Sequence, residues 1–415
     1  MYIGFLSKYA NKAEKTVDKF FNRITIYTKT DRIQNRLIEL MKENLIVVNL
    51  WLERKFKNYT FLKKKVRRNL YINAEKIGQE FDNFYQKFDI DASYFKEIFA
   101  SFNLAYQERF EKEFKCLTAI MAYLYPGKHY KYLDSSNFAN LLKNPGDELL
   151  QGDCNQIVTL YVYLFSRHCD ITNLRIKLPK EHVCLHFAGI DIEATNASWQ
   201  NYKEYIYIAP ITELISVNLL DILDPREETA EIDPKIALKG AQLAYNLSGN
   251  RQLVEKNLLV AYHNMALKCE KKGDYKSAIY FAERAKNIDL LKTINYNAAI
   301  YFSKLYKFSD AKHFAAKSGS PDLKKAIMAQ EAAFYYNNNQ VKKARELYRY
   351  LGDGEMVKAT YQKEYNNIYK TIPTSLRTTA DYKKYKSRYY QLLQIARAGG
   401  MTEQAGQLEK FLRQI

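Results

Sequence analysis

The chain has 415 residues, which is too long for one ordinary core, and 47% of them are hydrophobic and 27% charged, as in globular proteins. No stretch approaches the ~18 apolar residues that a membrane span needs, and the first residues lack the apolar core and cleavage site of a signal peptide. The sequence therefore predicts a soluble, cytoplasmic protein of two or three domains.

The net charge is +18, from 64 Lys and Arg against 46 Asp and Glu. Such an excess attracts nucleic acid, anionic membranes or acidic proteins. The positive residues are spread along the chain, with one dense cluster at 63–68, KKKVRR. Because a run of this kind is usually a solvated helix face, nucleic-acid binding through the N-terminal region is the weaker partner hypothesis.

Cysteine and histidine spacing gives no sign of a disulfide framework, a metal site or a cofactor. The cysteines are odd in number and form no CxxC pair, and the six histidines lack zinc-finger or HExxH spacing. We expect five reduced thiols, at Cys116, Cys154, Cys169, Cys184 and Cys269.

Residues 1–95 are predicted to form a basic helical region. Apolar residues there, Ile33, Leu37 and Leu40 among them, recur three to four positions apart. Helix is expected to continue beyond 95, with breaks at Pro126-Gly127 and at 144–147, NPGD. We find no chemistry in this part of the chain.

In the segment 96–225 the residue pattern changes from helical to mixed, and it predicts an α+β domain. Gly152, Asp153 and Cys154 open an apolar run, IVTLYVYLF, that is typical of a buried helix. Three strand-like runs follow, LRIKLP at 174–179, HVCLHF at 182–187 and IDIEAT at 190–195, with a tight turn at Ala188-Gly189.

Residues 230–415 are helical again and periodic. Two sets of alanines recur every 33 residues, as stacked helical hairpins require where helices cross closely: Ala266, Ala299 and Ala332, and Ala278, Ala311 and Ala344. The unit AYHNMALKCEKKGDYKSAIYFAERAKNID closely resembles the tetratricopeptide repeat. A further helical pair at 389–414, with a Gly399-Gly400 turn, is expected to cap the array after an insertion at 352–384.

Cys154 is the candidate nucleophile. Asp153 can cap the helix that begins at this cysteine, so the helix N-terminus would stabilise a thiolate. Gly152 is expected to leave room for a substrate beside the sulfur. Asp191 and Glu193, two residues apart on one strand, share a face, and either could accept a hydrogen bond from His182.

The strings GDCNQIVTLYVYLF, LPKEHVCLHF and DIEATN resemble the transglutaminase-like (papain-type) superfamily, and most of all bacterial members that also carry tetratricopeptide repeats. The resemblance implies Cys154 as nucleophile, His182 as general base and Glu193 as the acidic residue that orients it, with Asp191 as the alternative. It implies an α+β cysteine-proteinase-type domain between an N-terminal helical region and a C-terminal all-α tetratricopeptide-like solenoid.

Several alternatives stay open. His186 shares the strand face of His182 and could be mistaken for the base, but His182 is favoured because it lies near a proline as in the family pattern, whereas His168 is expected to stabilise a helix C-terminus. The remaining cysteines are expected to be small core residues. The first functional hypothesis is a thiol hydrolase or acyltransferase acting on an amide or peptide-type bond. The second is a non-catalytic scaffold whose repeats bind a protein or peptide partner.

Overall fold

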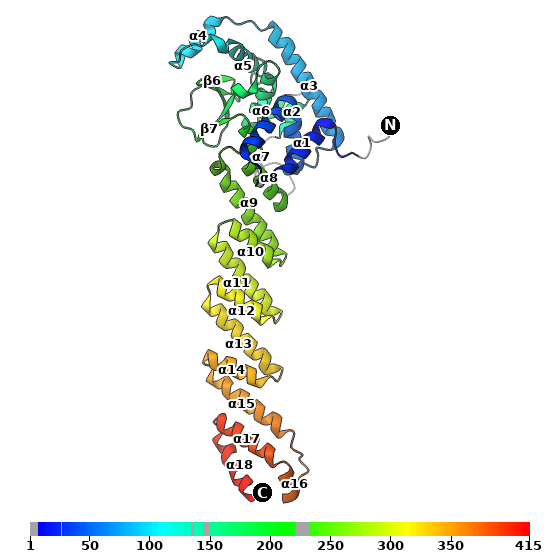
Figure 1. The fold of residues 1–415 in the computed structure, drawn as a ribbon, viewed down its shortest axis with the longest axis vertical. Helices are drawn as coiled ribbons and strands as arrows, with labels where there is room; N and C mark the ends of the chain where they lie inside the picture. The colour runs from blue at the N-terminus through cyan, green and yellow to red at the C-terminus, as the bar shows by residue number, and fades with distance from the viewer. Residues whose placement is uncertain (1–6, 26, 129, 134–136, 144–148, 221–232) are drawn as a thin grey trace. The chain divides into compact units, whose positions relative to one another are not determined.

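A computed structural model of the chain has two compact units, Met1–Met265 and Ala266–Ile415 (Figure 1). It describes residues 7–25, 27–128, 130–133, 137–143, 149–220 and 233–415. Along the chain, a small region of sheet lies between helical N-terminal and C-terminal parts, which agrees with the predicted layout. The predicted break at 144–147 and the predicted boundary at 225–230 lie outside the described residues.

The helices of the first unit bury apolar faces in one continuous core, to which Leu37, Phe81, Phe114 and Ile157 belong. The predicted 1–95 region forms most of the first four helices, and Gly127 forms a turn with φ 81° shortly after the fifth. The helices are α1 (Lys12–Arg23), α2 (Thr30–Phe56), α3 (Lys64–Lys87), α4 (Ala92–Ser101), α5 (Glu111–Tyr123), α6 (Cys154–Ser166), α7 (Glu213–Leu220), α8 (Pro234–Leu247) and α9 (Arg251–Lys271), whose residues from Ala266 onward belong to the second unit.

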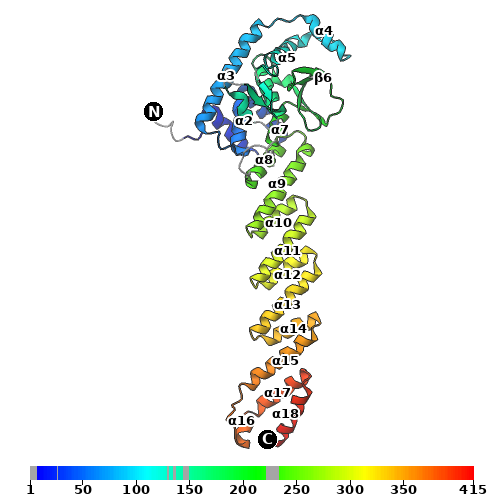
Figure 2. The same ribbon diagram turned by 180° about the vertical axis from the view of Figure 1, so that it is seen from behind.

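The main sheet is antiparallel, with strand order β6-β5-β4-β3-β7. Figure 2 shows β6 at one edge. The predicted strands correspond to β3, β4 and β5, each shorter than expected, while β6, β7 and the small parallel pair β1-β2 were not predicted. Three or four residues are too few to show a period in the sequence. The strands are β1 (Tyr130–Tyr132), β2 (Leu150–Gly152), β3 (Arg175–Leu178), β4 (Cys184–Phe187), β5 (Ile190–Glu193), β6 (Ser198–Gln200) and β7 (Tyr207–Pro210).

The two faces of this sheet differ in chemistry. On one face Ile176, Leu185 and Ile192 are buried in adjacent register positions, in the common core. The opposite face carries His186 and Asp191, which are cross-strand partners. Since side chains alternate along a strand, residues two apart stay on one face, and Glu193 therefore lies on the same face as Asp191.

The second unit is an array of helices in which consecutive helices pack together. All six alanines of the predicted 33-residue registers are fully buried. Its helices are α10 (Tyr275–Arg284), α11 (Ile288–Lys304), α12 (Phe308–Ser318), α13 (Pro321–Asn337), α14 (Val341–Leu351), α15 (Gly354–Tyr369), α16 (Thr379–Lys384), α17 (Lys386–Ala398) and α18 (Thr402–Gln414).

The turns between these helices repeat at the same interval. Gly273, Tyr306 and Asn339 all have positive φ, and so do the equivalent residues of the alternate turns, Lys286, Gly319 and Gly352. The helices α11, α13 and α15 are capped by side chains 33 residues apart, Asn287, Ser320 and Asp353. The array is therefore a repeat in its backbone as well as in its alanines.

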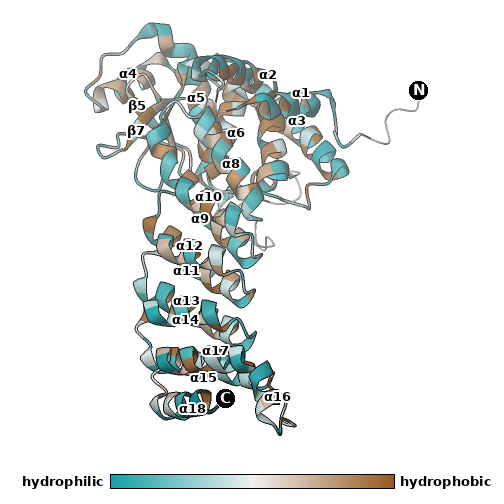
Figure 3. Ribbon diagram, turned by 60° about the horizontal axis from the view of Figure 1, so that its bottom comes forward, coloured by the Kyte–Doolittle hydropathy of each residue, from teal (hydrophilic) through white to brown (hydrophobic). Residues whose placement is uncertain are grey.

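The helices of both units mix hydrophobic and hydrophilic residues along their length, as expected of helices that bury one face (Figure 3). Among the described helices, none combines the length and apolar character required to cross a membrane.

Candidate active site

Helix α6 presents Cys154 at its first residue. Asp153 is the N-cap, and it forms a capping box with Gln156, in which each side chain accepts a hydrogen bond from the other residue's backbone N–H at 3.2 Å. The Cys154 side chain is partly exposed. The sulfur therefore lies beside the backbone N–H groups and the positive end of a well-capped helix.

The expectation that Gly152 leaves room for a substrate is wrong. A Cβ atom at Gly152 would lie 2.7 Å from Cδ1 of Leu141, so the space beside this glycine is filled by a core leucine. The glycine is required by packing and not by substrate access.

His182 lies in a turn and not at the start of a strand as predicted. Its backbone N–H donates to the Pro179 carbonyl at 3.3 Å, and Glu181 has φ 56°, so the chain becomes extended only at Cys184. The ring is 25% exposed, and its Nε2 lies 2.6 Å from Oε2 of Glu193. The Cys154 thiol interacts with this ring strongly enough to raise its pKa, and the sulfur lies 3.9 Å from Oδ1 of Asn155.

Glu193 is a buried carboxylate, 3% exposed, on β5. Burial alone would raise its pKa, but hydrogen bonds from His182, Thr195 and Tyr202 outweigh burial and lower the pKa to about 2. The Tyr202 hydroxyl donates to Oε2 at 2.6 Å, and Thr195 donates its N–H at 2.9 Å and its hydroxyl at 2.5 Å to Oε1. Glu193 is therefore charged and fixed in orientation at neutral pH.

Two groups favour the protonated form of the His182 imidazole. The hydrogen bond with Cys154, followed by the hydrogen bond and charge of Glu193, raises the pKa of His182 to about 10 against the opposing effect of burial. Because Nε2 faces Glu193, Nδ1 is the ring nitrogen left for the thiol. The arrangement can support a thiolate–imidazolium pair.

Asp191 holds a different imidazole. Its Oδ1 lies 2.7 Å from Nδ1 of His186, and its Oδ2 accepts from Lys177 Nζ and from the Tyr202 backbone N–H, each at 2.7 Å. Burial would raise the pKa of Asp191, but these donors lower it. The structure thus brings Glu193 to His182 and places Asp191 with His186.

Tyr202 and Thr195 are residues of this site that sequence reasoning missed. Tyr202 lies in the loop between β6 and β7, and a lone loop tyrosine among 35 in the chain carries no signal. Thr195 follows Glu193 by two residues, so its backbone and side chain reach the carboxylate locally. Tyr202 and Thr195 are recognised as residues of the site only by their hydrogen bonds to Glu193 in the structure.

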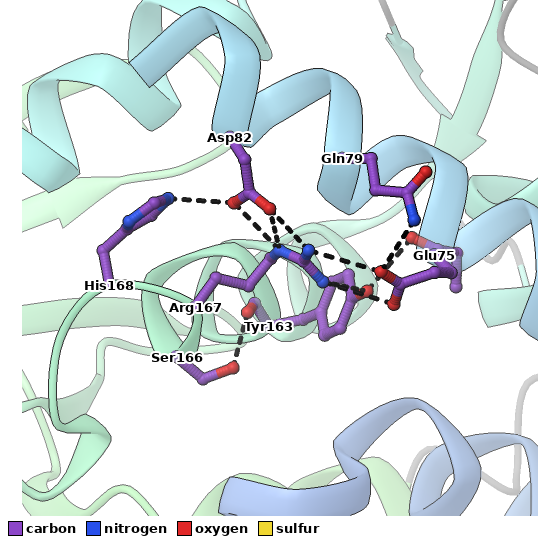
Figure 4. Close-up of polar contacts among 8 residues, drawn as sticks. Glu75, Gln79, Asp82, Tyr163, Ser166, Arg167 and His168 are labelled. Atoms are coloured by element: carbon purple, nitrogen blue, oxygen red, sulfur yellow. Dashed lines mark hydrogen bonds and ion pairs between the residues drawn. The ribbon is translucent and has the colours of Figure 1, made fainter. Parts of the chain in front are cut away.

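The opposite end of α6 is held by ion pairs to α3 (Figure 4). Arg167 donates to Asp82, with Nη2 at 2.5 Å, and to Glu75 at 3.3 Å. His168 Nε2 lies 2.9 Å from Asp82, so this histidine faces α3 and not the helix C-terminus as predicted. Burial lowers the pKa of His168 despite this carboxylate. These contacts fix the helix that carries Cys154.

Of the other cysteines, Cys116, Cys184 and Cys269 are buried, as expected of core residues, and their pKa values are raised. Cys169 differs from the prediction because it is partly exposed. A hydrogen bond from Cys116 lowers the pKa of Cys169. This thiol is therefore the competitor for Cys154 in any labelling experiment.

Within the described ranges, no group of three or more His, Cys, Asp and Glu side chains is arranged to hold a metal ion. No protein-family model matches this chain, and no curated protein sequence matches it either.

Proposed function

We propose that the first unit is a thiol enzyme of the transglutaminase-like, papain-type class, and that the second is a tetratricopeptide-like array that recruits a protein or peptide partner. The proposal is supported by the 2.6 Å contact of His182 with the buried, charged Glu193 and by the effect of Cys154 on the same imidazole. These side chains come from a helix N-terminus, a turn and a strand, and the thiol and imidazole are partly exposed.

In the first half-reaction the Cys154 sulfur bonds to the carbonyl carbon of an amide and the carbonyl electron pair moves to oxygen. When the carbonyl reforms, the C–N bond breaks and the His182 imidazolium gives its proton to the leaving amine. Water or an acceptor amine then attacks the thioester, His182 takes the proton of that nucleophile, and the C–S bond breaks to restore the thiolate beside the imidazolium. Glu193 keeps the ring oriented throughout.

The oxyanion of these steps would form next to the start of α6. The first N–H groups of a helix have no intrahelical acceptor, and Asp153 accepts the one from Gln156. The backbone N–H groups of Cys154 and Asn155 are the nearest donors of this kind, and the helix dipole adds to their effect.

The proposal is tested by alkylation with iodoacetamide at pH about 6, where an ordinary cysteine is under about 1% thiolate. Cys169→Ser is used as the background in order to remove the competing thiol. We expect Cys154 to react first, by peptide mass spectrometry, and at least tenfold more slowly after His182→Gln. The matched control, His186→Gln, changes the other imidazole–carboxylate pair and should leave the rate unchanged.

The enzyme proposal fails if Cys154 reacts no faster than buried Cys269, or if the two histidine variants behave alike. A scaffold function is the second candidate, because the array has its own cavity of about 440 Å³ whose lining includes Leu267, Tyr275 and Tyr301. Partner capture that depends on Tyr301 but not on Cys154 would favour the scaffold.

A further inference from the structure

Helices α1 and α2 pack together (Figure 1), and an open pocket of about 550 Å³ is lined by residues of both helices and of the segment between them. Four of its lining side chains are cations, two from each helix at a spacing of one turn: Lys19 and Arg23, and Arg32 and Arg36. The apolar part of the lining is Phe20, Ile24 and Ile33. A cavity of this size fits a small organic molecule.

The side chains of the four cations are exposed to solvent. In the part of the chain that the structure describes, none of them forms an ion pair or hydrogen bond with a carboxylate, and none of the cavity-lining residues is acidic. Like charges one turn apart on a helix repel each other. Two such pairs line one pocket, and an anion bound there would reduce their repulsion.

The start of α2 adds to the positive field. Its N-cap, Lys29, makes no side-chain hydrogen bond to the first turn, so N–H groups of that turn lack a cap. Arg32 lies close to this helix N-terminus, where a cation is disfavoured by the helix dipole and an anion is favoured. Asp31 is the acidic residue of the first turn and does not line the cavity.

We propose that the cavity between α1 and α2 binds the phosphate group of an organic phosphate. The guanidinium groups of Arg23, Arg32 and Arg36 can bind phosphate oxygens bidentately, with Lys19 as an additional point charge. Phe20 and Ile24 offer an apolar surface to the organic part of the ligand. The ligand is either a free phosphorylated molecule, such as a nucleotide, or the headgroup of an anionic lipid. The proposal does not depend on the chemistry of Cys154.

The test uses the full chain with two probes. ATP is titrated by calorimetry, and vesicles of phosphatidylcholine with and without phosphatidylglycerol are used in flotation. The variant is Arg32→Gln/Arg36→Gln, and the matched control, Lys65→Gln/Arg68→Gln, removes the same charge from exposed residues of α3 in the dense basic cluster. The charge-preserving variant Arg32→Lys/Arg36→Lys separates bidentate binding from net charge.

We expect the α2 arginine-to-glutamine variant to weaken the binding of one probe at least tenfold. The control variant should change this affinity less than twofold, and the lysine variant should retain only part of the lost affinity. ATP binding with this pattern identifies the free ligand, and vesicle binding that requires phosphatidylglycerol identifies the headgroup. Equal losses in the variant and the control would overturn the proposal. So would the absence of binding to either probe, or the same pattern seen only with RNA.

Discussion

Glu193 keeps its charge in a buried position because donors surround it. Desolvation of a carboxylate normally favours the neutral form, but the hydrogen bonds from His182, Thr195 and Tyr202 stabilise the anion more. The charged carboxylate then favours the imidazolium of His182. Tyr202 joins the two carboxylates of the sheet, because its hydroxyl binds Glu193 and its backbone N–H binds Asp191.

Glu193→Gln should lower the pKa of His182 from about 10 toward the ordinary value of about 6.5, because the variant removes the charge and one hydrogen-bond acceptor. The measurement is the pH titration of the ring signals in protein labelled at histidine, with His182→Gln for assignment. An unchanged titration of His182 would contradict the predicted role of Glu193.

The same pKa shift predicts how stability depends on pH. The folded-state pKa of His182 lies above the unfolded value, so this group stabilises the fold fully below pH about 6.5 and loses that contribution as the pH rises through about 10. In Glu193→Gln the decrease in unfolding free energy over this range should be smaller.

At the scale of elements, the alanine registers determine how closely the helices of the second unit approach. Ala299 and Ala311 are fully buried in one cluster with Phe308. A larger side chain at such a position would separate α11 from α12, because a close-packed interface does not yield space.

Ala311→Leu should therefore destabilise the second unit by about 1–3 kcal/mol through overpacking. Ala316→Leu is the matched control, because Ala316 is exposed on the same helix and its replacement should change stability by less than about 0.5 kcal/mol. Urea unfolding followed by circular dichroism measures both. Equal effects of the two variants would show that burial in this register does not govern stability.

At the scale of the whole molecule, each unit has its own core. The first unit also contains a buried ion pair, in which Arg67 Nε donates to Glu14 at 2.7 Å, and the Tyr71 hydroxyl donates to the same carboxylate at 2.6 Å. Burial, followed by the Glu14 charge, raises the pKa of Tyr71, so the phenol stays a donor.

Glu14→Ala should cost about 3–5 kcal/mol, because it leaves the Arg67 charge buried without a partner. Hydrogen exchange read by mass spectrometry should show faster exchange in α1, α2 and α3 and little change in α11–α15. Ala311→Leu should instead show faster exchange in α11–α15 and little change in α1, α2 and α3. Loss of protection in both units from either variant would contradict independent cores.

The periodic parts of this fold could be predicted from the sequence. Alanines 33 residues apart predicted buried helix crossings, and the Asp153-Cys154 pair predicted the start of a capped helix, because both depend on local spacing and local hydrogen bonds. The short strands β6 and β7 escaped prediction because pairing with their neighbours, and not their own pattern, makes them strands.

By itself, the sequence predicted the helix that holds the candidate thiol and the strand that holds the candidate carboxylates, since these follow from residue type and period, but it placed His182 on a strand and not in a turn. Tertiary structure alone decided that Glu193 faces His182 while Asp191 faces His186, because a shared strand face does not fix which partner each carboxylate meets. The tertiary structure also brings Arg23 and Arg36 to one pocket. The densest basic run of the sequence does not line this pocket. Charged residues that are distant in sequence can act on one ligand only when the tertiary structure brings them close together in space.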